Sequence, residues 1–181
     1  SIYGAIQKMV MRDNYLIVVQ ELKVAHVPVN ISILEDQTEQ LNVAVSNKLF
    51  NNVRYMPSGI GSGLAKKAIA TSGIGTVYFV DPNNGYPCRD GYDGVKIINT
   101  KMSKYFINKL KNANPLNIVS YYDDQNQEWN LTFEDETIVW SEKKNRWISL
   151  LILMVVFIFT KKVIFVTNSM GSNIKQVLIS Q

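Results

Sequence analysis

Residues 117–150 alternate between short runs of strand-forming residues and tight polar turns. This spacing constrains the fold more than any other feature of the sequence. The runs start near residues 117, 128, 137 and 146, about ten residues apart. In the second run, Trp129, Leu131 and Phe133 fall on one face, because successive side chains of a strand point to opposite sides. Four strands at this spacing are typical of a sandwich, a barrel or one blade of a propeller.

Two earlier stretches predict further units of the same kind. The stretch 67–98 predicts four strands, at 67–71, 76–80, 86–89 and 95–98. The stretch 4–29 predicts a meander of three strands, at 5–11, 15–19 and 23–29. Pro28 has no backbone N–H and is therefore expected at a sheet edge or a strand end. Residues 31–52 leave two alternatives open, a polar loop or a short helix that runs to about Leu49.

One segment changes to a helical period. Met102, Phe106 and Leu110 are spaced four apart, with Lys101, Lys104 and Asn108 off their face, which predicts a short helix over 101–111. The fold class is therefore mainly β, made of antiparallel four-stranded meanders with one short helix. If each meander is a blade, the chain is a partial β-propeller of about two to three blades. Pro57–Gly63 is predicted to be a flexible loop.

The composition changes abruptly near Trp147. Residues 1–147 contain 16 of the 19 basic residues, all 15 acids, all nine Tyr and all three Trp. The remaining 34 residues contain three lysines and no acid. The formal charge of +4 therefore comes mostly from the tail. No basic face is expected on residues 1–147, so the sequence predicts no specific nucleic-acid binding.

We divide the chain into a propeller-like domain over 1–150, expected to be a fragment since it begins at Ser1, and an apolar tail over 151–181. Ile148–Phe159 is a twelve-residue apolar run, shorter than the roughly twenty residues of a membrane-spanning helix. Lys161 and Lys162 would lie inside any longer span. Three interpretations of the tail stay open: a buried element, a weak membrane anchor, and a segment translated out of frame. The first residues show no signal peptide.

The sequence predicts no catalytic, cofactor-binding or metal site. Cys88 and His26 are the chain's single cysteine and single histidine. They could form a nucleophile–base pair, but a half-buried strand residue and a surface histidine are the favoured interpretation. The glycines at 59, 61 and 63 match neither the phosphate-loop nor the dinucleotide-binding spacing.

Acidic residues gather in turns. The run 81–85 (DPNNG) resembles part of a calcium loop but has its glycine one position early, and Asp90 or Asp93 could add oxygen ligands. Hairpin turns are the favoured interpretation of both segments. The acids at 123–124 and 134–136 lie at opposite ends of one predicted strand, roughly 20 Å apart, and are interpreted as solvated turn residues rather than an acid–base pair.

Aromatic residues mark three successive strands of the last unit. Trp129, Trp140 and Trp147 are expected to pack across strands and fix the register, and a sugar-binding platform is the alternative. The glycosylation sequons at Asn30 and Asn130 are interpreted as chance matches.

Two long segments carry a family resemblance. They are TVYFVDPNNGYPCRDGYDGVKIINTKMSKYF, residues 76–106, and NIVSYYDDQNQEWNLTFEDETIVWSEKKNRWIS, residues 117–149. Together with the N-terminal GAIQKMVMRDNYLIVVQELKVAHVPVN, they resemble β-propeller-type tail and DNA-stabilisation proteins of short-tailed bacteriophages, including crAss-like phages. The chain departs from the pattern at Asn99, where serine is frequent, and after Ser149, where a continuation with proline and glycine is lost.

The resemblance implies a non-enzymatic structural component of the virion, near the tail or portal. It implies other virion proteins as partners, a homo-oligomer around a symmetry axis, and synthesis in the host cytoplasm. Two to three blades cannot close a ring of four or more. The alternative function is a small all-β binding module that the C-terminal segment tethers to a membrane.

Overall fold

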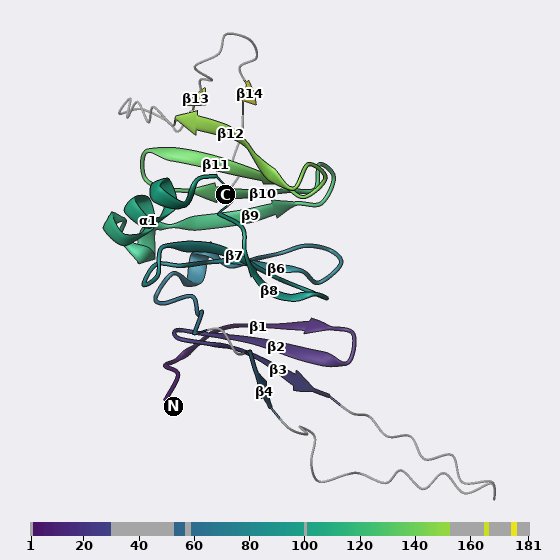
Figure 1. The fold of residues 1–181 in the computed structure, drawn as a ribbon. Coiled ribbons are helices and arrows are strands. Elements are labelled where there is room, and N and C mark those ends of the chain that lie inside the picture. The colour runs from purple at the N-terminus through teal and green to yellow at the C-terminus, as the bar shows by residue number, and fades with distance from the viewer. Residues whose placement is uncertain are drawn as a thin grey trace, which may run out of the picture.

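The computed structural model describes residues 2–29, 53–56, 59–99, 101–152, 165–166 and 175–176. Three antiparallel four-stranded sheets follow one another along the chain and lie one beyond the next (Figure 1). We call them the first, second and third sheets. In each sheet the strands are ordered as they occur in the sequence, as expected for meanders. The predicted fold class, mainly β with one short helix, is confirmed.

The first sheet contains the three strands predicted for its segment and a fourth that was not predicted. Pro28 is the last residue of its strand, as expected. The fourth strand has only two residues, Arg54–Tyr55, which pair with His26 and Ala25. The strands are β1 (Ile6–Arg12), β2 (Tyr15–Gln20), β3 (Val24–Pro28) and β4 (Arg54–Tyr55). The two alternatives for residues 31–52 lie outside the described residues.

The second sheet corrects one predicted boundary. The strand expected at 67–71 begins only at Ala70, because Lys66–Ala68 forms a 3₁₀ turn, η1. The turn buries Ala65 and Ala68 and leaves the two lysines between them exposed. The remaining strands agree with the prediction within one or two residues. The strands are β5 (Ala70–Thr71), β6 (Val77–Asp81), β7 (Tyr86–Gly91) and β8 (Gly94–Ile97).

The predicted helix is present as α1 (Ser103–Asn112), with Phe106 and Leu110 buried. It starts two residues later than expected because Lys101 has a left-handed backbone, with φ of 61°. Gly85, in the turn between β6 and β7, approaches the helix closely. A Cβ there would lie 2.6 Å from the Cα of Ile107, and the φ of Gly85 is +76°. A glycine is therefore required for α1 to pack on this turn.

The third sheet has the four strands that the ten-residue spacing predicted. Its first strand starts at Val119 rather than 117, because Pro115–Asn117 forms a second 3₁₀ turn, η2. The strands are β9 (Val119–Asp123), β10 (Glu128–Thr132), β11 (Glu136–Ser141) and β12 (Arg146–Ile152). A further pair, β13 (Phe165–Val166) and β14 (Lys175–Gln176), is antiparallel and was not predicted.

The tail is otherwise outside the described residues, so the division at residue 150 and the three interpretations of the tail stay predictions. Within the described part of the chain, no helix is both long and apolar enough to cross a bilayer.

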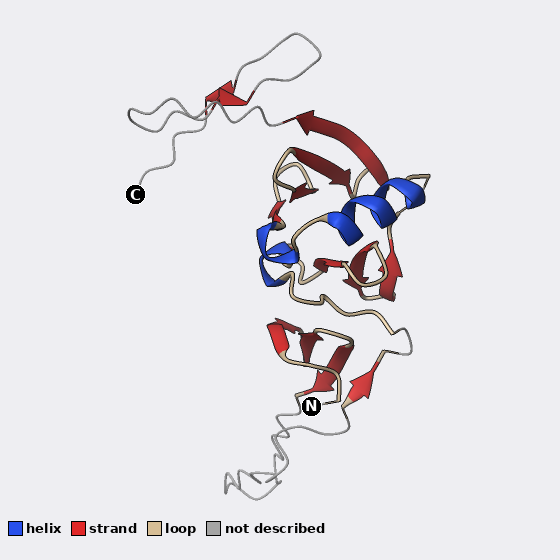
Figure 2. Ribbon diagram, turned by 90° about the vertical axis from the view of Figure 1, so that its left-hand side faces the viewer, coloured by secondary structure: helices blue, strands red, loops and turns tan. Residues whose placement is uncertain are grey.

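Strand β6 of the second sheet is buried on both sides. Val77 and Phe79 of β6 belong to a core shared with the first sheet. Tyr78 and Val80 face the other way, into a core shared with α1 and the third sheet. This explains the continuous apolar run of β6, since a strand covered on both faces has no polar side. Figure 2 shows the second sheet and α1 between the two outer sheets.

Candidate assembly surfaces

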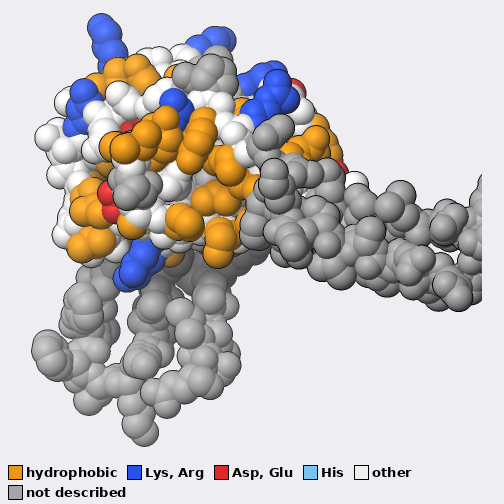
Figure 3. All heavy atoms as spheres, turned by 90° about the horizontal axis from the view of Figure 1, so that it is seen from below, with side chains coloured by type: hydrophobic (Ala, Val, Ile, Leu, Met, Phe, Trp, Pro, Cys, Tyr) orange, Lys and Arg blue, Asp and Glu red, His pale blue; other side chains and the backbone are white. Residues whose placement is uncertain are grey.

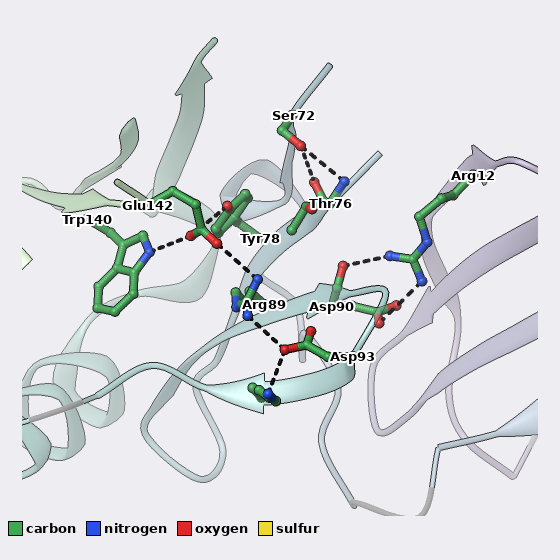
Figure 4. A network of polar contacts seen from close by, with 10 residues as sticks. Arg12, Ser72, Thr76, Tyr78, Arg89, Asp90, Asp93, Trp140 and Glu142 are labelled. Atoms are coloured by element: carbon green, nitrogen blue, oxygen red, sulfur yellow. Dashed lines mark hydrogen bonds and ion pairs between the residues drawn. The ribbon is translucent and has the colours of Figure 1, made fainter. Parts of the chain in front are cut away.

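An ionic cluster lies between the first and second sheets. The Asp90 carboxylate is fully buried. His26 Nε2 lies 2.6 Å from Asp90 Oδ2 and Arg12 Nη2 lies 3.6 Å from Oδ1. Arg12 Nη1 also donates to the Asp90 carbonyl at 2.9 Å (Figure 4). Two groups of the first sheet therefore hold one carboxylate of the second, and a buried charge requires such partners.

The backbone positions this cluster. Arg12 ends β1, and its register partner is Tyr15 of β2. His26 pairs with Ile17, so its ring lies on the sheet face that packs on the second sheet. Gly75 has φ of +81°, and a Cβ there would lie 3.0 Å from Cγ of Arg12. The turn before β6 therefore leaves room for the arginine stem.

A second polar network lies between the second and third sheets. Glu142, directly after β11, accepts hydrogen bonds from Tyr78 Oη at 3.0 Å, Arg89 Nη1 at 3.0 Å and Trp140 Nε1 at 2.9 Å (Figure 4). Burial, and then the Glu142 carboxylate, raises the pKa of Tyr78 far above its ordinary value of 10.0. At both junctions the later sheet supplies a carboxylate and the earlier sheet supplies donors.

A third group connects α1 to the third sheet. Lys109 Nζ lies 2.6 Å from carboxylate oxygens of Asp135 and of Glu136, and Tyr105 donates to Glu136 at 2.5 Å. Burial lowers the pKa of Lys109, but its hydrogen bonds to the two acids outweigh this, so the pKa is raised. Burial and Glu136 raise the pKa of Tyr105. The hydrogen bond from Lys109 lowers the pKa of Asp135.

The structure does not form the nucleophile–base pair. His26 contacts Asp90, whereas the Cys88 thiol is fully buried and donates to the Tyr86 carbonyl at 3.6 Å. Burial raises the pKa of Cys88 well above its ordinary range. This disfavours the reactive thiolate. The interpretation of His26 as a surface residue was wrong, because its side chain is only 13% exposed.

The glycine-rich segment is a loop, as predicted, but it is docked rather than free. The amide of Ser62 donates to the Gln20 carbonyl, and that of Gly63 donates to the Glu21 carbonyl, both at 2.9 Å. A Cβ on Gly61 would lie 2.3 Å from the Glu21 carbonyl oxygen. These amides are therefore already engaged and are not oriented toward a phosphate.

The suspected calcium loop is a hairpin turn, as favoured. Asp81 accepts hydrogen bonds from the amide and the side chain of Asn84, at 3.0 and 2.8 Å. Asp93 instead pairs with Arg89 and Lys96. Within the described part of the chain, no group of three or more His, Cys, Asp or Glu side chains is placed to hold a metal ion.

The paired acids lie at opposite ends of β10, as expected, but several of them are structural rather than simply solvated. Asp124 accepts the Gly73 amide at 2.6 Å and so connects the third sheet to the second. Glu134 accepts the Asn117 side chain at 2.5 Å. Asp135 and Glu136 bind α1 as described above. These contacts between turns are not visible in a local sequence pattern.

The three tryptophans pack as predicted. Trp129 and Trp140 are register partners and are 0% and 1% exposed. The ring of Trp147 lies 5.8 Å from Trp129 and 5.5 Å from Trp140, centroid to centroid. This burial overturns the sugar-platform alternative, which needs exposed rings. Asn130 is buried in β10, and Asn30 lies outside the described residues.

The sequence did not reveal the Arg12–His26–Asp90 cluster or the role of Glu142. One signal was present for the Arg12–His26–Asp90 cluster. On β3, His26 is two residues after the buried Val24, so the two side chains lie on the same face of the sheet, opposite Ile17 and Val19 of β2. A titratable side chain in such a phase predicts a buried partner. The partner could not be identified, because Asp90 is 64 residues away.

The first sheet carries an apolar surface on the side away from the second sheet. Two cross-strand rows form it, and we call them the open face: Met9, Val18, Ala25 and Tyr55 in one row, and Met11, Leu16 and Val27 in the other. Gln20, in phase with them near the turn, donates to the Gly4 carbonyl. Figure 3 views the molecule from this end and shows apolar side chains gathered across it.

Together these observations define a mainly β protein whose sheets stack through apolar cores and whose polar clusters connect neighbouring sheets. The chain belongs to the crassvirus muzzle protein family, because the family described as "Crassvirus muzzle protein" matches residues 1–169. It is therefore a structural protein of crAss-like phage particles, which confirms that part of the resemblance. No curated protein matches the chain.

Proposed function

We propose that this chain is a non-enzymatic building block of the virion near the tail or portal, where it acts by stacking sheets and presenting surfaces to neighbouring virion proteins. One observation supports this proposal above the others. Charged side chains of the described residues pair with one another across both junctions, in the Arg12–His26–Asp90 cluster and between Arg89 and Glu142. Such groups hold the sheets together rather than facing a substrate.

Two finer points of the proposal come from the sequence. The three stacked sheets are interpreted as blades of a partial β-propeller, and the chain is expected to repeat around a symmetry axis of the tail. A repeated ring of subunits needs the same surface patches in every copy. The open face is a candidate for such a patch.

The test is to localise the chain in purified virions. Mass spectrometry of gradient-purified particles, and of tails separated from DNA-filled heads, is expected to recover peptides of residues 2–29 and 59–99 in the tail fraction. An antibody to the chain is expected to label one end of the particle in electron microscopy. Recovery only from infected-cell lysate, and not from particles, would contradict the proposal.

A further inference from the structure

The turn between β6 and β7 contains the single Asn–Gly pair of the sequence, Asn84–Gly85. Asparagine is chemically labile, and it is most so before glycine, which has no Cβ to hinder attack by the backbone. The Gly85 nitrogen loses its proton to solvent and bonds to Cγ of Asn84. The side-chain amide takes up a proton and leaves as ammonia, so that a succinimide ring forms. Water then opens the ring at either carbonyl, which gives aspartate or isoaspartate.

The folded turn holds both reacting groups apart. The Gly85 amide donates to the Asp81 carbonyl at 2.8 Å, so the proton that must leave is already bound. Asn84 Nδ2 donates to Asp81 Oδ2 at 2.8 Å and to the Gly59 carbonyl at 3.4 Å. The backbone amide of Asn84 donates to Asp81 Oδ1 at 3.0 Å. Attack on Cγ requires the carboxamide and the following peptide plane to rotate, and it therefore breaks hydrogen bonds to Asp81.

The helix α1 restricts the same turn from the other side. Gly85 is buried, and a Cβ there would lie 2.6 Å from the Cα of Ile107. The peptide between residues 84 and 85 therefore has little room to rotate while α1 is docked. The Asn84 side chain is exposed, so water reaches the ring once it has formed. The slow step is then the local opening of the turn, which has a free energy of its own.

Deamidation would reverse the electrostatics of this turn. The Asp81 side chain is buried, with the residue only 1% exposed, and both of its oxygens accept hydrogen bonds from Asn84. An acid at position 84 would replace the donor on Asp81 Oδ2 by a second negative oxygen, and two carboxylates at such a distance repel each other. Isoaspartate would also lengthen the backbone by one carbon directly beneath α1. Either product therefore pushes the turn away from the helix.

We infer that Asn84 is a site of spontaneous deamidation, that Asp81 and the docking of α1 keep it unmodified, and that its conversion loosens α1 from the turn. The site lies inside one chain, so it is independent of the proposed place of the chain in the virion. Asn83 is the natural comparison, because it is also exposed but is followed by a residue with a Cβ.

The test follows modification at position 84 by peptide mass spectrometry, with the full chain incubated at mildly alkaline pH either folded or in urea. We expect the reaction to be at least about a hundredfold slower in the folded chain. Asp81→Asn is expected to accelerate it at least about tenfold in the folded chain and to leave the rate in urea unchanged. Ile107→Ala keeps every hydrogen bond of the turn and is expected to accelerate it at least about threefold. Circular dichroism confirms that each variant is folded.

Three outcomes would overturn the inference. The first is equal rates in the folded and the unfolded parent, which would mean that the fold gives no protection. The second is a parent-like rate in the folded state of both Asp81→Asn and Ile107→Ala. The third is conversion of Asn83 in urea as fast as that of Asn84, which would mean that the glycine does not select the site.

A second pair of variants tests the consequence of conversion. Asn84→Asp and Asn83→Asp add the same charge to neighbouring exposed residues, but only the first places it against Asp81. Hydrogen exchange of the α1 amides is expected to become at least about tenfold faster in Asn84→Asp and to change less than about twofold in Asn83→Asp. Equal exchange in the two variants would overturn the link between conversion and the docking of α1.

Discussion

The two junctions between the sheets are held together by different interactions. Among the described residues, the core between the first and second sheets has eight buried apolar residues, of which only Phe79 is aromatic, and it lies beside the Arg12–His26–Asp90 cluster. The core between the second and third sheets has fourteen described residues, including five aromatic ones, and it also includes residues of α1. The first junction is therefore a small contact whose geometry is set by the polar cluster. The second is a larger contact that is stabilised by its buried apolar area.

This difference implies an order of stability within one chain. Buried charges contribute geometry more than net free energy, because desolvation offsets most of their attraction. Aromatic burial contributes free energy directly. The second and third sheets with α1 are therefore expected to form the stable body, and the first sheet is expected to separate from it first.

Trp129→Ala is expected to give a loss as large as any of these variants, about 3–5 kcal/mol of the free energy of unfolding. The side chain is completely buried and its ring packs at a tilt against the rings of Tyr78 and Trp147. Urea denaturation followed by circular dichroism measures this. A loss below about 1 kcal/mol would mean that the second junction is not an aromatic core.

Asp90→Ala is expected to cost about 3–5 kcal/mol, because Arg12 and His26 would be left buried without their carboxylate. Glu142→Gln, at the second junction, is the matched control and is expected to cost about 1 kcal/mol, since Glu142 is 30% exposed and an amide oxygen still accepts hydrogen bonds.

The first junction can also be tested by replacing its charges altogether. A triple variant, Arg12→Met with His26→Phe and Asp90→Leu, is expected to lose less than Asp90→Ala alone, since an apolar replacement removes the desolvation cost. Equal losses in the two variants would show that leaving Arg12 and His26 without the Asp90 carboxylate carries no extra cost.

Alkaline pH is expected to weaken both junctions, through Cys88 at the first and Tyr78 at the second. The pKa of Tyr78 is raised in the folded chain, so its stabilising contribution is present below pH 10 and is lost as the pH rises toward the folded pKa. The expected loss from Tyr78 is about 1.4 kcal/mol per pH unit above 10. Urea midpoints between pH 8 and 11.5 measure it, and Tyr78→Phe should flatten the slope. An unchanged slope in that variant would contradict the assignment.

Asp135→Asn is expected to have the smallest effect, about 0.5 kcal/mol or less. Its carboxylate is 69% exposed, and Lys109 keeps Glu136 as a partner. Because the pKa of Asp135 is lowered in the folded chain, this contribution exists above its ordinary pKa of 3.8 and is lost as the pH falls. The difference between variant and parent midpoints should therefore be measurable at pH 7 and should shrink at pH 2.5.

Local pattern predicted the elements well and their long-range partners poorly. The ten-residue spacing located the strands of the third sheet, and the alternation of Trp129, Leu131 and Phe133 gave their buried face. The strand β4 was missed because two residues carry no periodicity, and its partner β3 ends 26 residues earlier.

Contacts between sheets could not be predicted from local sequence patterns either, because the contacting residues are far apart in the sequence. The residues of the Arg12–Asp90 ion pair are 78 positions apart, and Glu142 is 64 positions from Tyr78. Such pairs are set by how whole sheets stack, which no window of strand length contains. The exposure of the open face could not be predicted either. Met9 and Met11 lie on the same side of β1, but the sequence does not indicate which side of the sheet is covered.

Native-state hydrogen exchange, read by mass spectrometry or NMR, tests the inequality of the two junctions most directly. The account predicts that amides of β2 and β3 open with a free energy at least about 2 kcal/mol below that of β10 and β11, and that Asp90→Ala widens the gap. Equal opening free energies in the first and third sheets, unchanged by Asp90→Ala, would show that the three sheets unfold as one unit and would contradict it.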